Sequence, residues 1–364
     1  MKIYFNVMSI TLISTLLLSC DKPNENKIYN EYFEKIDFNG QVLIAKKGNI
    51  IYQQSFGFSN MEGKIQSRDN DTYIVGSITK QFTAFCILIL EDKKLLTVSD
   101  SLSKYYPNLP ENWPTITIHD LLTHTSGMPT WEDIEDFDIK TPYSAEDMIK
   151  VLALKPLPFF EKGRFRYSSI GYVLLGGIIE KVSNKNYCQF VEENVFKPLN
   201  MNSTGCVDDL HLEDITTTGY AKQSDGTILK VPYNYETYAR GNSNLYSNLK
   251  DLISWDESIR NKNLLSETGY RKWYSGYAQV LEQSEYEDKG DQLGYGWFLT
   301  FNNGNELFKT YHLGGVTGYK AAITRFPREE MLIVTLSNVE DQHSDKIRLD
   351  FPKLVYKNEI DKQR

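Results

Sequence analysis

GQVLIAKKGNIIYQQSFG, residues 40–57, is the stretch that decides the fold. Two runs of β-forming residues flank a central Lys-Gly-Asn, and this pattern predicts a β-hairpin. Three more short strand-like runs lie far along the chain, at residues 306–312, 319–326 and 331–337. Strands from both ends of a chain can share one sheet only if the intervening chain leaves the sheet and returns. We therefore expect an α+β fold in which a five-stranded antiparallel sheet is flanked by helices and interrupted by a large insertion.

The insertion is predicted to be mostly helical. SITKQFTAFCILILEDK, residues 77–93, is apolar on almost every face, which is typical of a helix buried where two subdomains meet. Further helical candidates lie at residues 169–182, at 249–259, and at 345–356, where a terminal helix can pack on the sheet. The predicted division is a signal peptide at 1–19, a tether and first helix at 20–36, a sheet subdomain at 37–76 plus 305–358, and a helical subdomain at 77–304. We expect the active site at the interface of these two subdomains.

The N-terminal segment predicts export. Residues 7–18 form a nearly continuous apolar run after a single charge at Lys2, and this run is shorter than the roughly 20 residues of a membrane-spanning helix. Leu17-Leu18-Ser19-Cys20 resembles a bacterial lipobox, in which the cysteine is acylated and becomes the new N-terminus. We expect an exported lipoprotein, periplasmic or associated with the outer membrane, anchored to a membrane by a lipid on Cys20. An ordinary signal peptide cleaved nearby is the alternative.

Charge, cysteine and histidine content exclude several classes of protein. The chain has 40 basic and 48 acidic residues, a net charge of −8, which speaks against a nucleic-acid-binding protein. No His-Glu-x-x-His pattern occurs among the five histidines, so a structural or catalytic zinc ion is not expected. Cys86, Cys188 and Cys206 follow the signal segment, and their odd number allows at most one disulfide, whose pair the sequence leaves open. Burial as small apolar side chains is the favoured interpretation for them.

The pattern Ser-x-x-Lys begins at Ser77, Ser101 and Ser247, whereas the sequence has no Gly-x-Ser-x-Gly nucleophile elbow. Ser101 lies in a polar stretch, and Ser247 has the position of an N-cap before residues 249–259. Ser77 differs because it opens the buried helix, where free N–H groups can stabilise an oxyanion. Lys80 lies one turn further on, and a poorly solvated lysine has a lowered pKa, so its amine can accept the serine proton. An ordinary N-cap beside a surface lysine is the alternative on these local features.

Five further motifs follow Ser77 in a set order. They are LLTHTSG at residues 121–127, YSS at 167–169, GNSNLYS at 241–247, YGW at 295–297 and HLGG at 312–315. With GQVLIA at residues 40–45, this ordered set resembles the penicillin-recognising serine hydrolases, which include class C β-lactamases, D-Ala-D-Ala carboxypeptidases, D-aminopeptidases and related esterases. The resemblance extends from about residue 36 to residue 340. Within it, His124 to Gly127 is expected to form a structural turn.

The resemblance implies a role for each matching residue. Ser77 would be the acylated nucleophile and Lys80 its proton-transfer partner. Tyr167 opens the family's Tyr-x-Asn motif and would carry a proton between serine, leaving group and attacking water. The backbone N–H groups of Ser77 and Gly315 would form the oxyanion hole, with Gly315 on an edge strand that also pairs with the substrate. The implied reaction is acyl transfer to serine followed by hydrolysis, without a metal or cofactor.

Two positions depart from a typical β-lactamase. His312-Leu313-Gly314 stands where many members have Lys-Thr-Gly and some have His-x-Gly, so His312 would be a catalytic residue without the permanent charge of lysine. Leu313 and Gly314 would bind substrate, as would Ser169, whose hydroxyl replaces the amide of Tyr-x-Asn and offers fewer hydrogen bonds. We therefore expect a small ester, or a D-amino-acid peptide or amide, to be a better substrate than a β-lactam. The alternative is a catalytically silent cell-envelope lipoprotein that binds muropeptide, a β-lactam or a protein partner.

Overall fold

The computed structural model describes residues 25–138, 141–154, 161–207, 212–282, 288–340 and 344–360. The chain divides into two units, Met1–Asp37 and Phe38–Arg364. The first unit contains helix α1 (Glu25–Lys35), while the predicted signal peptide and Cys20 lie outside the described residues. Across the described ranges, no helix combines the length and the apolar character that crossing a membrane requires.

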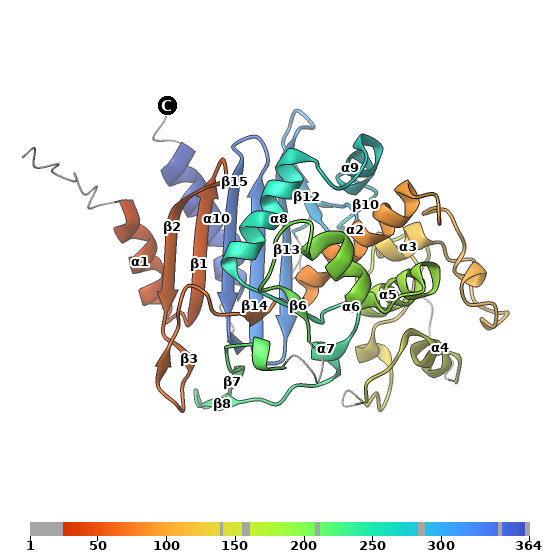
Figure 1. Ribbon diagram of the computed structural model, residues 1–364, viewed down its shortest axis with the longest axis horizontal. Coiled ribbons are helices and arrows are strands. Elements are labelled where there is room, and N and C mark those ends of the chain that lie inside the picture. Colours follow the sequence, from red (N-terminus) through yellow and green to blue (C-terminus); the bar gives the residue numbers. More distant parts are fainter. Residues whose placement is uncertain are drawn as a thin grey trace, which may run out of the picture. The chain divides into compact units, whose positions relative to one another are not determined.

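The second unit is built on an eight-stranded antiparallel sheet with the strand order β10-β11-β12-β13-β14-β15-β1-β2 (Figure 1). Its strands are β1 (Gly40–Lys46), β2 (Asn49–Phe56), β10 (Ala278–Gln279), β11 (Gln292–Leu293), β12 (Phe298–Phe301), β13 (Leu307–Val316), β14 (Tyr319–Phe326) and β15 (Met331–Ser337). All five predicted strands are present. β1 pairs with β15 from Gly40 opposite Ser337 to Lys46 opposite Met331, so segments from the two ends of the unit meet within the sheet, as expected.

The predicted number of strands is wrong, because the sheet has eight strands rather than five. The three additional strands, β10 to β12, continue the sheet beyond β13. β10 and β11 are two residues long each, which is too short to show an alternating pattern in the sequence. Only their hydrogen-bonded pairing in the folded chain identifies them as strands.

Helix α2 (Thr79–Asp92) is the central helix of the insertion. Every residue from Thr79 to Leu90 is buried, as predicted for residues 77–93, and helices α5 (Ser169–Ser183) and α9 (Glu267–Trp273) pack against it. The first residues of the predicted helix instead form a short 3₁₀ turn, η1 (Gly76–Ile78). Consequently Ser77 lies in this turn, and α2 begins two residues after it.

The other elements of the insertion are short. The helices are α3 (Ile118–Leu122), α4 (Ala145–Leu154), α6 (Tyr187–Val191) and α7 (Tyr235–Tyr238). Short strands form three small sheets: β3 (Phe58–Asn60) with β4 (Ile65–Gln66); β5 (Tyr73–Ile74), β9 (Leu245–Ser247) and β6 (Gly205–Cys206); and β16 (Val339–Glu340), β7 (Tyr220–Lys222) and β8 (Ile228–Lys230). Segments outside the insertion contribute β3, β4, β5 and β16 to these sheets. The insertion is therefore mostly helical, as expected, with small strand pairs at its margins.

Helices α8 (Leu249–Asn261) and α10 (Ser344–Ile360) cover opposite faces of the large sheet (Figure 1). Arg325 on β14 donates a 2.6 Å hydrogen bond to Asp256 of α8. The ring of the next residue, Phe326, lies 4.9 Å from the ring of Tyr356 in α10. Because successive residues of a strand point to opposite faces, the two helices enclose the sheet between them.

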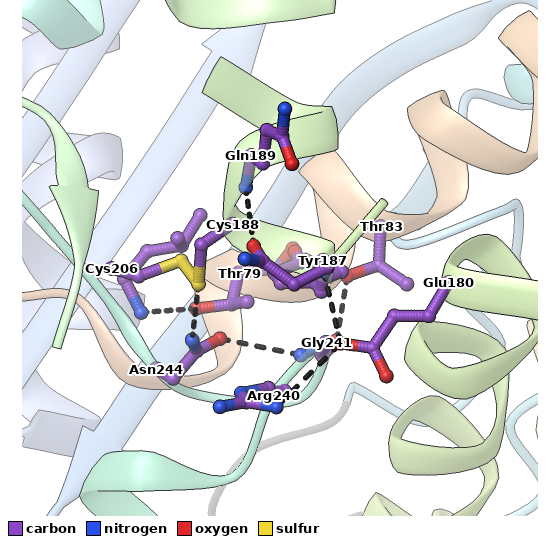
Figure 2. Close-up of a disulfide and its surroundings, with 12 residues drawn as sticks. Thr79, Thr83, Glu180, Tyr187, Cys188, Gln189, Cys206, Arg240, Gly241 and Asn244 are labelled. Carbon is purple, nitrogen blue, oxygen red and sulfur yellow. Dashed lines mark hydrogen bonds and ion pairs between the residues drawn. A yellow bond between two sulfur atoms is a disulfide. The ribbon is translucent and has the colours of Figure 1, made fainter. Parts of the chain in front are cut away.

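A disulfide joins Cys188 in α6 to Cys206 in β6 (Figure 2). The sequence allowed one disulfide and left its pair open, and the structure identifies that pair. Cys86 is buried in α2 and free. Asn244 lies beside the disulfide, and its side-chain amide donates to Cys188 Sγ at 3.6 Å. The disulfide therefore contacts the GNSNLYS segment at residues 241–247.

Candidate active site

Two glycines allow the turn η1 to lie directly against strand β13. Gly76 has a φ of +52°, and a Cβ atom there would lie 2.7 Å from the backbone nitrogen of Gly315. A Cβ atom on Gly314 would overlap the carbonyl oxygen of Val75 and lie 3.4 Å from the nitrogen of Ser77. Neither position leaves room for a larger residue. The backbone nitrogens of Ser77 and Gly315 therefore both lie where η1 contacts β13, and an oxyanion hole requires two such N–H groups close together.

Lys80 is buried beside Ser77, one helical turn further on. Its Nζ donates hydrogen bonds to Ser77 Oγ at 2.8 Å and to the carbonyl oxygen of Asn242 at 3.3 Å, and the side chain has no exposed surface. Burial lowers the pKa of Lys80 well below its ordinary value, against the opposing effect of the Glu132 carboxylate. The neutral amine that burial favours can accept a proton from Ser77.

The segment that carries Asn242 is held by α2 and by its own side chains (Figure 2). Thr83 Oγ1 donates to the carbonyl oxygen of Gly241 at 2.6 Å, and the N–H of Gly241 donates to Asn244 Oδ1 at 3.2 Å. Thr83 and Lys80 lie three residues apart on α2, so one helix face holds the segment at two neighbouring points. The GNSNLYS motif thus supplies a hydrogen-bond acceptor for Lys80, a role that sequence reasoning did not assign.

A cavity beside Ser77 collects most of the predicted site residues. Those that line it are Ser77, Tyr167, Ser169, His312, Leu313 and Gly315. Lys80 reaches the cavity through Ser77 Oγ, and its Nζ lies 5.0 Å from the centre of the Tyr167 ring. Gly314 is the exception, since it packs against Val75 and is not among the lining residues. The structure therefore brings the predicted nucleophile, base, tyrosine and histidine to one place.

The imidazole of His312 is buried and uncharged. Burial lowers the pKa of His312 to about 3, and nearby Lys80 acts in the same direction. Its Nδ1 donates to the carbonyl oxygen of Leu313 at 2.6 Å. The position that carries lysine in many relatives therefore presents no positive charge at neutral pH. In the part of the chain that the structure describes, no group of three or more His, Cys, Asp and Glu side chains is placed to hold a metal ion.

Sequence reasoning did not identify three charged residues that line the cavity: Glu132, Lys320 and Glu340. Lys320 Nζ lies 3.9 Å from Glu340 Oε1. Lys320 is paired with Gly315 across β13 and β14, so the register of that hairpin was a signal that could have placed it near the site. Glu132 and Glu340 come from segments far apart in the sequence, and only the folded chain brings them together.

The two other Ser-x-x-Lys copies have structural partners. Lys104 forms an ion pair with Asp100 at 2.8 Å, and Ser101 is not among the cavity-lining residues. The predicted N-cap at Ser247 is wrong by one residue, because Asn248 caps α8 by accepting the N–H of residue 251 at 2.9 Å. Ser77 is therefore the copy that combines a buried lysine with a cavity.

A family model described as Beta-lactamase matches residues 36–356. The chain belongs to the Beta-lactamase family. The match confirms the family that the ordered motifs indicated. Penicillin-binding protein 4* of Bacillus subtilis (strain 168) is 29% identical to this Beta-lactamase family member over 351 residues, covering 88% of this chain and 73% of that protein.

Solved structures agree with this assignment. A penicillin-binding protein from Bacillus halodurans has a TM-score of 0.76 at 26% identity, over 89% of this chain and 98% of that one. A D-amino acid amidase from Ochrobactrum anthropi SV3, complexed with L-phenylalanine amide, also has a TM-score of 0.76 over 93% of this chain and 98% of that one. Its identity is 16%, so that likeness concerns the fold alone. The protein is a serine hydrolase of the Beta-lactamase family with the expected α+β fold.

Proposed function

We propose that this enzyme hydrolyses small esters or D-amino-acid amides through an acyl-enzyme on Ser77. The observation that carries the proposal is the 2.8 Å hydrogen bond between Ser77 Oγ and the fully buried Nζ of Lys80. A serine hydroxyl is a weak nucleophile until a base removes its proton, and a desolvated amine is such a base. In acylation the Ser77 oxygen bonds to the substrate carbonyl carbon while its proton passes to Lys80. The N–H groups of Ser77 and Gly315 then stabilise the oxyanion.

The remaining steps need a proton donor for the leaving group. Tyr167 lines the cavity together with Ser77 and lies close to Lys80. We assign to its phenol the relay of this proton: Tyr167 gives its own proton to the departing alkoxide or amine as the bond to the carbonyl carbon breaks, and takes the proton that Lys80 received from Ser77. A water molecule then attacks the acyl carbon, and one of its protons passes through Tyr167 and Lys80 to Ser77 Oγ. The bond between Ser77 and the acyl carbon breaks, and the Ser77 hydroxyl is restored.

The charges around the cavity favour a substrate with a positive group. Burial lowers the pKa of Lys80 and lowers that of His312 to about 3, so burial opposes a positive charge at both positions. The charged lining residues are two carboxylates, Glu132 and Glu340, and one ammonium, Lys320. Lys320 is paired with Glu340 at 3.9 Å, which leaves the Glu132 carboxylate to attract a substrate ammonium such as the α-amine of an amino-acid ester or amide. This charge distribution supports amino-acyl substrates over β-lactams.

Glu132→Gln is therefore expected to reduce kcat/KM for an amino-acid ester with a free α-amine, relative to the N-acetylated form of the same ester. The expected reduction is about two- to five-fold, because Glu132 is exposed and an ion pair between exposed groups is weak. The ratio of the two substrates is the quantity to measure, because any effect of the variant on the pKa of Lys80 acts on both. The exposed Glu135 offers a matched control through Glu135→Gln. An unchanged ratio would remove Glu132 as a contact for the substrate amine.

Intact-mass spectrometry tests the proposed function. The protein beginning at Asp21 is exposed in turn to an activated ester, a penicillin and a D-Ala-D-Ala peptide. We expect an added acyl mass that peptide mapping places on Ser77, formed fastest with the ester. No adduct and no turnover with any reagent would favour the alternative, a binding protein that uses this fold without catalysis.

We also propose that the chain is exported and carries a lipid on Cys20. The support is in the sequence alone, in the apolar run at residues 7–18 and the Leu-Leu-Ser-Cys that follows. Cells that express the full chain and are grown with a labelled fatty acid should label the wild type and not Cys20→Ser. Equal labelling of both would contradict the anchor.

A further inference from the structure

His124 has a backbone conformation that few residues other than glycine adopt. It follows α3 within the LLTHTSG motif, has a φ of +53° and is buried. A residue with a side chain rarely adopts a positive φ unless its surroundings hold it there. Two backbone hydrogen bonds do so: Arg166 N–H donates to the carbonyl oxygen of His124 at 2.9 Å, and Gly163 N–H donates to that of Thr125 at 2.8 Å. The turn is therefore fastened to the segment that leads into Tyr167.

The His124 side chain contacts that segment at two consecutive residues. Its ring stacks on the ring of Tyr167, with centroids 4.3 Å apart and planes at 21°. Its Nδ1 accepts the backbone N–H of Ser168 at 3.0 Å. Ser168 Oγ in turn donates to the carbonyl oxygen of Pro129 at 2.9 Å and caps α5. Tyr167 thus has its ring held by His124 and its backbone held through Ser168.

The ring of Tyr167 also lies close to Lys80, the proposed base. Lys80 Nζ lies 5.0 Å from the centre of the Tyr167 ring, and His124 is not among the described residues that line the cavity. We propose that His124 is a positioning residue, which sets the place of the Tyr167 phenol relative to Lys80 and Ser77 without touching the substrate. This role rests on the proposed function, in which Tyr167 gives a proton to the leaving group. A neutral imidazole is needed because Nδ1 must accept, and burial lowers the pKa of His124 well below its ordinary value.

Two substitutions separate the two contacts of His124. His124→Phe keeps a ring that can stack but removes the acceptor for Ser168 N–H. His124→Asn keeps an acceptor and a residue type that tolerates positive φ, but removes the ring. If His124→Phe fails to fold, His124→Asn still provides the measurement.

The readout is the ratio of kcat/KM for an alkyl ester to that for a nitrophenyl ester of the same acid. An alkoxide needs a proton from Tyr167 to leave, whereas a nitrophenolate leaves without one, so only the alkyl ester depends on the place of the phenol. We expect the His124 variants to lower the ratio by about 10- to 100-fold, the size of effect that a displacement of about 1 Å produces. Tyr167→Phe should lower it in the same sense, and a second substitution at His124 should then add little.

His119→Phe is the matched control. His119 lies on the adjacent helix α3, accepts or donates at Nδ1 with the Tyr295 hydroxyl at 2.8 Å, and packs edge-on against Tyr277. It contacts neither Tyr167 nor Ser168 in the described hydrogen bonds and ring pairs, so its loss should leave the ratio unchanged. Equal losses on both esters in the His124 variants, or no loss, would overturn the positioning role while the proposed function stands. If the wild type hydrolysed neither ester and no D-amino-acid amide, both the positioning role and the proposed function would be overturned.

Discussion

Ser77→Ala is expected to lower kcat/KM for every ester that the wild type hydrolyses by on the order of 10⁶-fold, the loss seen when the nucleophile of a serine hydrolase is removed. The methyl group of alanine cannot bond to the carbonyl carbon, so no acyl-enzyme forms and the added mass disappears. The backbone N–H of residue 77 remains, and so does the cavity. Steady-state kinetics and intact mass on the same preparations measure the two effects.

The chain offers its own control for this change. Ser101→Ala alters the same Ser-x-x-Lys pattern at a site where the lysine is paired with Asp100 and no cavity-lining residue is lost. We expect full activity from it. The free energy of unfolding of Ser77→Ala should also lie within about 1 kcal/mol of the wild-type value, because the substitution removes one hydrogen bond. Adduct formation by a folded Ser77→Ala protein would show that another residue is the nucleophile.

Lys80→Met is expected to lower the acylation rate by about 10²- to 10⁴-fold, the contribution typical of a positioned general base. Methionine fills much of the same buried space and cannot accept a proton. The variant should still bind substrate, because Lys80 is not among the cavity-lining residues, so the loss should fall on kcat rather than on KM. Lys104→Met, the corresponding change in the exposed copy of the motif, should leave acylation unchanged. Equal losses in the two variants would argue against Lys80 as the base.

The same substitution should alter the pH dependence of stability. Burial lowers the pKa of Lys80 in the folded protein, while an unfolded lysine has a pKa of about 10.4. Between these two pKa values the unfolded chain binds a proton that the folded chain has lost, so wild-type stability rises with pH across this window. Lys80→Met lacks the group, so its free energy of unfolding should lack this rise and should equal or exceed that of the wild type near pH 7. Chemical denaturation at a series of pH values measures both. A wild-type stability that falls with pH in this window, relative to Lys80→Met, would contradict a lowered pKa.

The strands and the buried helix were predictable because their signals are local. Apolar runs bounded by turn residues at both ends of the chain predicted the shared sheet, and the apolar sequence at residues 77–93 predicted α2. The short strands β10 and β11 were not, since two residues carry no periodicity. The turn at Ser77 was also missed, because the close approach of Gly76 to Gly315 depends on a strand more than 200 residues away in the sequence.

The sequence by itself determined which chemical groups the site contains and in what order they occur: a serine followed by a lysine one turn later, a tyrosine, and a histidine-glycine segment on a strand. Only the tertiary structure decided what those groups can do. The lowered pKa of Lys80 comes from burial, and its acceptor at Asn242 comes from a distant segment held by Thr83. The charges of Glu132, Lys320 and Glu340 join the site by proximity alone. Burial and distance set pKa values and electrostatic attraction, and neither quantity exists until segments far apart in the chain have packed together.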